Sequence, residues 1–303
     1  MAGDTERFVI EPRGPYRLTT MMAFLDSFQP AGVAASDDPV LRVAFVVDGT
    51  EDVAAVDIRQ TEVNGPVSVG VTTTAPIEAV THHVARLLSV DHDGAGYPDI
   101  GQRDPVIGEL QAANPGFRPT GFWSPFEAAV WAITSHRIQM TQAAKLKAEI
   151  ARRFGTLVHH DGHDLTAFPA PAVLAEADLS TVSGLGGRKP EWLHGIAVAA
   201  ADGALGADRL RAMPADEALA ALRRLAGVGP FSAELILIRG AMTVDVPPGN
   251  EGRFVGALAA AYGMSAPMDP ATIDRITDGW APYRTWVSVL IRSAAGEGPR
   301  SRR

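Results

Sequence analysis

Residues 225–240 have the sequence LAGVGPFSAELILIRG, and residues 244–254 follow with VDVPPGNEGRF. Gly227 and Gly229 permit backbone conformations with positive φ, and Pro230 suits the first turn of a helix. The pattern predicts two helices joined by a tight turn, with the free N–H groups of the second helix directed outward, where they can bind a phosphate. On this stretch alone, a merely compact connection between two helices is the favoured interpretation.

The composition is that of a globular protein with a sizeable core. Of the 303 residues, 46% are hydrophobic and 20% are charged, which suits one large domain or two smaller ones. No apolar run is long enough to cross a bilayer, and the N-terminus lacks the basic flank and apolar centre of an export signal, so we expect a cytoplasmic location. The chain has no cysteine, which excludes disulfides, cysteine-ligated zinc, iron–sulfur clusters and thiol nucleophiles.

Acidic residues are concentrated in the first third of the chain. Residues 1–113 contain 17 acidic and 7 basic residues, a net charge of −10, whereas residues 114–303 contain 18 and 20, a net charge of +2. Phosphate binding depends on a local basic surface rather than on total charge. The overall charge of −8 therefore leaves nucleic-acid binding open for the second part of the chain.

The first part of the chain predicts a small α+β domain. The β-rich segments VLRVAFVVDG, DVAAVDIRQTEV and PVSVGVTTT are separated by turn residues, which predicts an antiparallel sheet. Helices are expected over YRLTTMMAFLDSFQP before the sheet and over PIEAVTHHVARLLSV after it. Residues 91–105, rich in Gly and Asp, predict a linker. We therefore expect an N-terminal α+β domain at residues 1–113 and an all-α domain at residues 114–303.

Beyond the linker nearly every segment has helical period and composition. The segment HHDGHD at residues 159–164 could suggest a metal site, but its spacing matches no closed ligand set, so a mobile polar loop is favoured. Helices are expected near residues 125–135, 139–154, 171–177, 188–202, 215–225, 230–240, 250–262, 270–279 and 283–295.

The motifs of this helical part follow one another as in the helix-hairpin-helix DNA glycosylases. They are SPFEAAVWAITSHRIQMTQAAKLKAEIARRFG, GLGGRKPEWLHGIAVAAADG, the glycine hairpin with DVPPGNE, and WAPYRTWVSVLIRS. In this combination the chain resembles the 3-methyladenine DNA glycosylase II (AlkA-type) family. The resemblance covers nearly the whole length, because that family also begins with a small α+β domain whose opening is similar to PYRLTTMMAFLDSF. It implies a monomer that acts at the nucleoid on double-stranded DNA containing a damaged base, with no membrane partner.

The resemblance implies a role for each matching residue. Gly227, Val228 and Gly229 match the hairpin that binds a DNA backbone phosphate, where Na⁺ or K⁺ can bind at the carbonyls; no other metal or cofactor is implied. Glu251 matches the aspartate that supports cleavage of the N-glycosidic bond after the nucleotide flips into a pocket between the two domains. Bifunctional relatives carry a nucleophilic lysine where this chain has Phe231, so a monofunctional hydrolytic enzyme is implied.

Several matching positions carry a different type of residue. Arg137 occupies the position of an apolar wedge that fills the gap left by the flipped base, and His136 replaces a neighbouring glutamine. Of the aromatic positions that stack on cationic alkylated bases, Phe231 retains one, whereas Leu235 and Arg292 occupy two others. A pocket that contains Arg292 should disfavour a positively charged base.

Structural roles compete with these functional ones. Glu251 can be simply an acid in the first turn of a helix capped by Asn250. Trp131, Trp192 and Trp286 are expected in the core. For the whole protein two classes of function are open: a monofunctional DNA glycosylase of base excision repair, or a noncatalytic paralogue of the same fold that binds DNA or recognises lesions.

Overall fold

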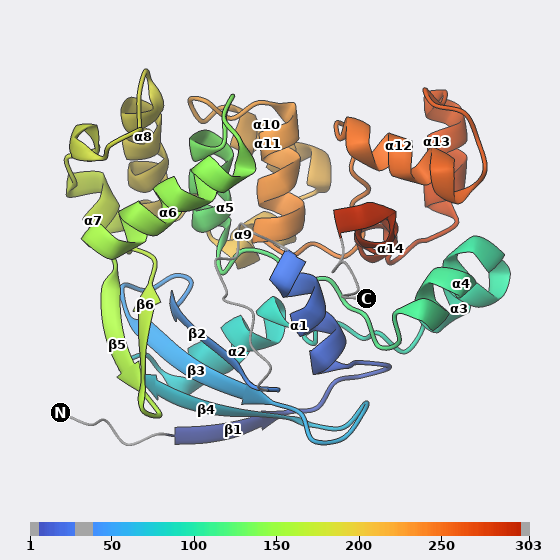
Figure 1. Ribbon diagram of the computed structural model, residues 1–303, viewed down its shortest axis with the longest axis horizontal. Helices are drawn as coiled ribbons and strands as arrows, with labels where there is room; N and C mark the ends of the chain where they lie inside the picture. The colour runs from blue at the N-terminus through green and yellow to red at the C-terminus, as the bar shows by residue number, and fades with distance from the viewer. Residues whose placement is uncertain (1–5, 28–38, 298–303) are drawn as a thin grey trace.

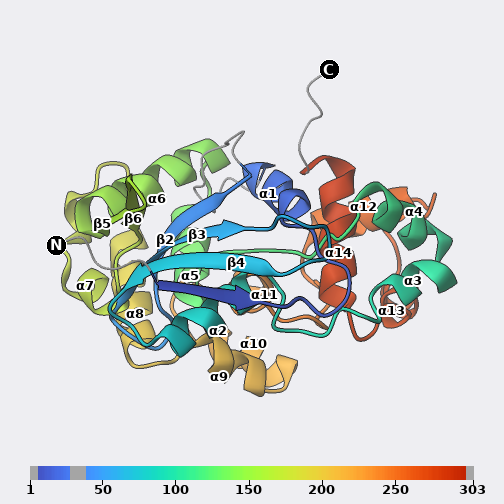
Figure 2. The same cartoon turned by 90° about the horizontal axis from the view of Figure 1, so that it is seen from below.

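The computed structural model describes residues 6–27 and 39–297 and shows a layer of helices packed on one antiparallel sheet (Figure 1). Seen from below, the outer face of the sheet is turned to the viewer and the helices lie behind it (Figure 2). The predicted α+β class is confirmed. In the described part of the chain, no helix has the length and apolar character needed to cross a membrane.

The sheet has the strand order β1-β4-β3-β2, and all neighbouring strands are antiparallel. Val56 at its centre lies opposite Val43 on one side and Val71 on the other, so that β-branched side chains pack across the strands. The three predicted strands are confirmed, and a fourth, β1, was not predicted. The strands are β1 (Glu6–Ile10), β2 (Leu41–Val46), β3 (Val53–Arg59) and β4 (Val67–Thr73).

Two helices share a hydrophobic core with this sheet. They are α1 (Leu18–Ser27) and α2 (Ile77–Leu87), which contribute Met21 and Val84 to the cluster around Phe45. Both helices were predicted; the expected end of the first, at residues 28–30, lies outside the described residues.

The predicted linker is wrong for its second half, which forms α3 (Pro98–Arg103) and runs into α4 (Pro105–Ala113). Each helix has proline in its first turn, and Asp104 caps α4 by accepting hydrogen bonds from the N–H groups of Val106 and Ile107. Ile107 packs with Trp286 of the C-terminal part. These capping signals were obscured by the high Gly and Asp content. The domain boundary at residue 113 stays a prediction.

The helices predicted for the second part of the chain are confirmed, and two further short helices, α9 and the 3-10 helix η2 (Leu179–Thr181), were not predicted. Helix α5 is buried along its whole length and forms the centre of the main core. The helix after the glycine hairpin ends in a π-helical turn, η3. The elements are α5 (Pro125–Thr134), α6 (Met140–Phe154), α7 (Pro171–Glu176), α8 (Lys189–Ala201), α9 (Ala207–Ala212), α10 (Ala215–Arg223), α11 (Pro230–Leu235), η3 (Ile236–Gly240), α12 (Gly252–Ala261), α13 (Pro270–Asp278) and α14 (Arg284–Arg292).

The HHDGHD segment belongs to a β-hairpin, so the prediction of a mobile loop, and of an all-α second domain, is wrong. Strands β5 (Thr156–His160) and β6 (His163–Ala167) pair through a turn in which Asp161 and Gly162 both have positive φ, as a two-residue hairpin turn requires. The buried His160 fastens the hairpin to the main sheet, with Nε2 3.0 Å from Oδ1 of Asp57. The described residues contain no group of three metal-ligating side chains.

Candidate active site

A cavity of about 650 Å³ lies among α5, α11, α12 and α14. Four of the residues predicted for catalysis and base binding line it together: Glu251, Phe231, Leu235 and Arg292. All the described lining residues follow residue 121, whereas the resemblance implied a pocket between two domains. The fold thus brings together residues that are up to 61 positions apart, from 231 to 292.

Glu251 directly precedes the first residue of α12, and it lines the cavity. It is the N-cap residue of α12, but its side chain does not cap the helix; its Oε1 instead accepts a hydrogen bond from Nη1 of Arg292 on α14 in an ion pair. The interpretation in which Asn250 caps this helix is wrong, since the Asn250 side chain donates to Glu234. Glu251 is therefore held as a pocket carboxylate opposite a guanidinium.

Glu234, which the sequence analysis missed, holds the turn that precedes Glu251. Its Oε1 accepts hydrogen bonds from the backbone N of Gly249 at 3.1 Å and of Asn250 at 3.1 Å, and from Nδ2 of Asn250 at 2.6 Å; its Oε2 lies 2.9 Å from the same Asn250 backbone N. The side chain is buried, with 6% exposure. The available signal was a lone acid inside the apolar stretch SAELILI, because a buried carboxylate must have partners.

Phe231 and Leu235 form an apolar wall one helical turn apart on α11. Phe231 is 50% exposed, which is unusual for a phenylalanine and distinguishes it from the buried Trp131 and Trp286. An exposed ring at the rim of a cavity can bind the flat face of a base.

The glycine hairpin is confirmed between α10 and α11, but only one of its glycines needs a special conformation. Gly227 has φ +82°, and a Cβ atom there would lie 2.7 Å from Cδ1 of Ile133 and 2.8 Å from Cδ2 of Trp192. Gly229 does not use the positive φ that glycine permits: it has φ −88° and open space around a Cβ atom. Val228 between them is buried in the core.

Gly227→Ala should therefore destabilise the protein by on the order of 2 kcal/mol, because it combines a strained backbone with a clash against packed side chains. Thermal denaturation measures the loss. Gly229→Ala, two residues further on, is the matched control and should change the unfolding midpoint little. Equal losses in the two variants would show that the close approach at Gly227 is not what shapes the hairpin.

The turn between α5 and α6 carries Arg137, which was predicted to enter the duplex, and the neighbouring His136. Arg137 is exposed and has φ +56°, a conformation that is rare for residues other than glycine and is concentrated at functional sites. His136 makes an edge-on ring contact with Trp192 at 5.9 Å between centroids. Burial, together with the nearby cations Lys189 and Arg137, lowers the pKa of His136, so its imidazole is neutral at pH 7.

Trp192 is partly buried and packs against the main core, in line with the predicted core packing, and its ring joins three neighbouring segments. Its ring contacts His136, carries the Arg188 guanidinium 5.3 Å above its centroid and fills the space beside Gly227. Lys189 beside it donates from Nζ to the carbonyl of Thr134 at 2.8 Å. The hairpin, the start of α8 and the Arg137 turn therefore form one continuous packed unit.

Comparison with known proteins agrees with this arrangement. No protein-family model matches the chain. Over 202 residues the chain is 31% identical to DNA-3-methyladenine glycosylase 2 of Escherichia coli, an alignment that covers 64% of the chain and 66% of that protein. The chain belongs to the AlkA-type family of helix-hairpin-helix DNA glycosylases. A DNA-3-methyladenine glycosylase of Bacillus subtilis is 24% identical over 214 residues, with 70% of the chain and 69% of the relative covered.

Solved structures of glycosylases share the fold over nearly the whole chain. The 3-methyladenine DNA glycosylase from Archaeoglobus fulgidus superposes with a TM-score of 0.77 at 22% identity, covering 94% of this chain and 97% of that one. An 8-oxoguanine glycosylase/lyase of Clostridium acetobutylicum, bound to double-stranded DNA, gives a TM-score of 0.69 at 15% identity, with 97% and 99% covered. The AlkA-type architecture is therefore present from the sheet to α14.

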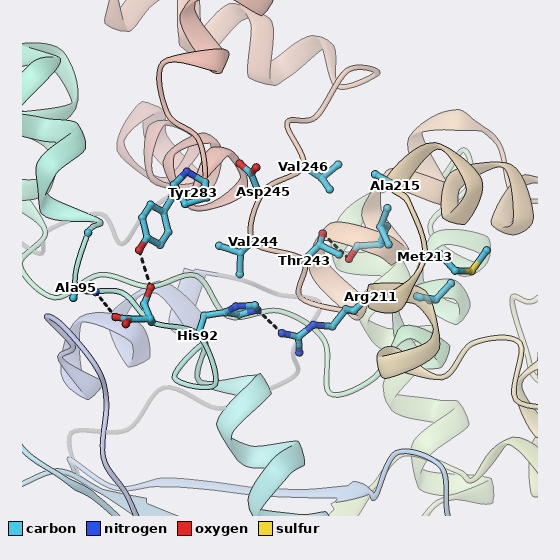
Figure 3. Close-up of a pocket in the computed structure, with 15 residues that line it drawn as sticks. His92, Ala95, Arg211, Met213, Ala215, Thr243, Val244, Asp245, Val246 and Tyr283 are labelled. Carbon is cyan, nitrogen blue, oxygen red and sulfur yellow. Dashed lines mark hydrogen bonds between the residues drawn. The ribbon is translucent and has the colours of Figure 1, made fainter.

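A second cavity, of about 670 Å³, lies away from the predicted site residues, between residues 92–96, α9 and the irregular segment 243–246 (Figure 3). Several of its polar side chains already have partners: Arg211 contacts Nε2 of His92 and pairs with Asp91 outside the cavity at 2.6 Å, and the Tyr283 hydroxyl donates to the carbonyl of Asp93 at 2.7 Å. None of the predicted site residues lines this cavity. The residues predicted for catalysis and base binding line the Glu251 cavity and not this one.

Proposed function

We propose that the protein is a monofunctional DNA glycosylase of base excision repair, which hydrolyses the N-glycosidic bond of a damaged base flipped out of duplex DNA. The observation that carries the proposal is the Glu251 carboxylate, which lines a cavity of about 650 Å³ together with the exposed ring of Phe231. Duplex DNA is the partner, and the protein acts as a monomer in the cytoplasm, at the nucleoid.

Cleavage of the glycosidic bond leaves positive charge on the deoxyribose while the bonding electrons depart with the base. A carboxylate close to the sugar stabilises that charge more in the transition state than in the ground state. Water then bonds to the sugar carbon and loses a proton, which leaves an abasic site. Glu251 supplies the carboxylate from the N-terminus of α12.

The cavity favours hydrolysis over strand cleavage. A lyase requires an amine that attacks the sugar carbon, and the lining residues in the described part of the chain include no lysine. Phe231 lies at the position where bifunctional relatives have that amine. We therefore propose an enzyme without lyase activity.

The packed unit around Trp192 is proposed as the DNA-binding surface. Gly227, Val228 and Gly229 bind a backbone phosphate, with Na⁺ or K⁺ at the hairpin carbonyls when DNA is bound. Arg137 enters the gap left by the flipped base, where a guanidinium can stack and hydrogen-bond with the orphaned base. His136, held against Trp192, lies next to it.

Arg137→Ala should weaken binding to an abasic duplex about tenfold more than binding to an intact duplex, because the side chain replaces lost stacking only where a base is absent or extruded. Fluorescence anisotropy with matched duplexes measures the difference. Arg137→Lys separates the roles: a phosphate contact tolerates lysine, whereas a stacked guanidinium does not. Equal weakening on both duplexes would make Arg137 an ordinary phosphate contact.

The proposed function is tested by the release of free bases from duplex DNA that has been randomly alkylated, deaminated or oxidised. Chromatography of the released bases should identify at least one lesion that the parent protein excises. The carboxylate of Glu251 is already paired with Arg292, which favours a second candidate function. In that case the protein is a noncatalytic paralogue that binds lesions. Tight binding to abasic duplex without release of any base would establish that alternative.

A further inference from the structure

A second carboxylate, Glu234, lines the same cavity as Glu251. It lies on α11 between the rim residue Phe231 and the wall residue Leu235, and only 6% of it is exposed. A buried carboxylate is expensive to keep unless its oxygens are hydrogen-bonded, so its presence in an otherwise apolar helix calls for a specific partner.

The partners of Glu234 all belong to the turn that leads into Glu251. Both of its oxygens accept from the Asn250 backbone N–H, at 3.1 and 2.9 Å, and Oε1 also accepts from Gly249 N at 3.1 Å and from Asn250 Nδ2 at 2.6 Å. With both oxygens bound to donors of the turn, Glu234 is poorly placed to contact a sugar or a water in the cavity. Its hydrogen bonds instead hold the backbone of residues 249–250.

In the described part of the chain, the turn before α12 has few other hydrogen bonds that could hold it in place. Glu251 has the non-helical angles φ −101° and ψ 95°, and among the described residues no side chain caps the first turn of α12. The residue before it, Asn250, is exposed and rests on Glu234 through both its backbone and its side chain. The direction of the Glu251 side chain is therefore set on one side by Arg292 and on the other by the turn that Glu234 holds.

We propose that Glu234 is a positioning residue for catalysis, which fixes the turn at residues 249–250 so that the Glu251 carboxylate faces the sugar of the flipped nucleotide. The proposal rests on the proposed catalytic role of Glu251. Because Glu234 and Phe231 share one short helix with the hairpin at its start, the same anchor keeps the carboxylate in register with the surface that binds phosphate and base.

Glu234→Gln tests the proposal while preserving size. An amide offers one acceptor and one donor, so that a donor would face the N–H groups of Asn250 and the turn would shift. A displacement of about 1 Å at a catalytic group can lower the rate on the order of 100-fold. We expect the single-turnover rate of base release to fall 10- to 100-fold, while affinity for abasic duplex changes little.

The matched control is Glu127→Gln. It removes the charge of another buried carboxylate, which lies outside the cavity and pairs with Lys147 at 2.8 Å. This variant should lower the unfolding midpoint at least as much as Glu234→Gln but leave the rate of base release unchanged.

Two further variants separate positioning from general loss of structure. Asn250→Asp combined with Glu234→Gln reverses the donor and acceptor of the side-chain pair, and should recover a measurable part of the lost rate. In the Glu251→Gln background, Glu234→Gln should slow the residual rate little, since a positioning residue acts only through the group that it positions.

The outcomes distinguish this proposal from the one on which it rests. A parental rate in Glu234→Gln together with a large loss in Glu251→Gln would overturn the positioning role alone. Independent, multiplicative losses in the double variant, or no rescue by Asn250→Asp, would also overturn it. A parental rate in Glu251→Gln itself would instead overturn the catalytic assignment of Glu251.

Discussion

Glu251→Gln should lower the rate of base release by about two to three orders of magnitude, the effect of removing one preorganised electrostatic group from an active site. The substitution keeps the size of the side chain and removes the charge that stabilises the developing cation on the deoxyribose. Duplex binding should be intact or tighter, because no carboxylate then repels the phosphates. Single-turnover release of a base that the parent excises, and anisotropy with an abasic duplex, measure the two effects.

Glu251→Asp is the informative companion variant. It restores the aspartate that the AlkA-type family has at this position, but the carboxylate retreats by a methylene from Arg292 on the opposite wall, so we expect a lower rate than that of the parent. Borohydride should trap no covalent adduct with the parent or either variant, because Phe231 provides no amine. A folded Glu251→Gln that works at the parental rate would exclude the carboxylate mechanism.

Arg292→Leu should shift the preference of the enzyme toward cationic bases by about 100-fold. The described cavity wall carries Arg239, Arg253 and Arg292 against Glu234 and Glu251, so removing Arg292 leaves the carboxylate of Glu251 without its partner. At a separation of roughly 6 Å, one charge changes the energy of a bound cation by about 2 to 3 kcal/mol. The measured quantity is the ratio of release rates for an N-alkylated cationic purine and a neutral deaminated purine.

Arg292 also orients Glu251, and a change in that orientation should affect the release rates of both substrates alike. The ratio of the two rates therefore isolates the effect of charge on the choice of base. Arg292→Lys is the control, because it keeps the charge and changes the geometry; the ratio should stay near the parental value even if both rates fall. An unchanged ratio in Arg292→Leu would mean that the guanidinium has no part in discriminating between charged and neutral bases.

The sequence predicted the elements with strong local signals and missed those defined by long-range contacts. The helix after the hairpin begins at Pro230 as expected, and the strand around Val69 lies in the predicted sheet. Helices α3 and α4 escaped because their glycines suggested a linker, whereas their stability comes from packing against Trp280 and Trp286. His160 escaped for the same reason, since its partner Asp57 is 103 residues away.

The candidate site shows the same division. Resemblance to the family placed Glu251 and Arg292 in one pocket, but their ion pair spans 41 residues and no local pattern predicts it. Glu234 was invisible because its partners are 15 and 16 residues away across a turn whose shape only the fold defines. Gly229 shows the opposite case. The motif suggests a backbone conformation that only glycine adopts, but the φ of Gly229 is −88°, which any residue can have.

The packing around Trp192 determines which partner must change shape when the complex forms. Ile133 and Trp192 leave no room beside Gly227, and the same indole contacts His136 next to Arg137, so this packing fixes the position of the glycine hairpin relative to the Arg137 turn. If the hairpin binds a phosphate and Arg137 fills the base gap, as proposed, the distance between those two contacts is fixed by the protein. The duplex would then have to kink to meet both, and the elastic energy of a kink is smallest where damage has already weakened base stacking. On that proposal a rigid protein surface would bind most readily where the DNA is most easily deformed.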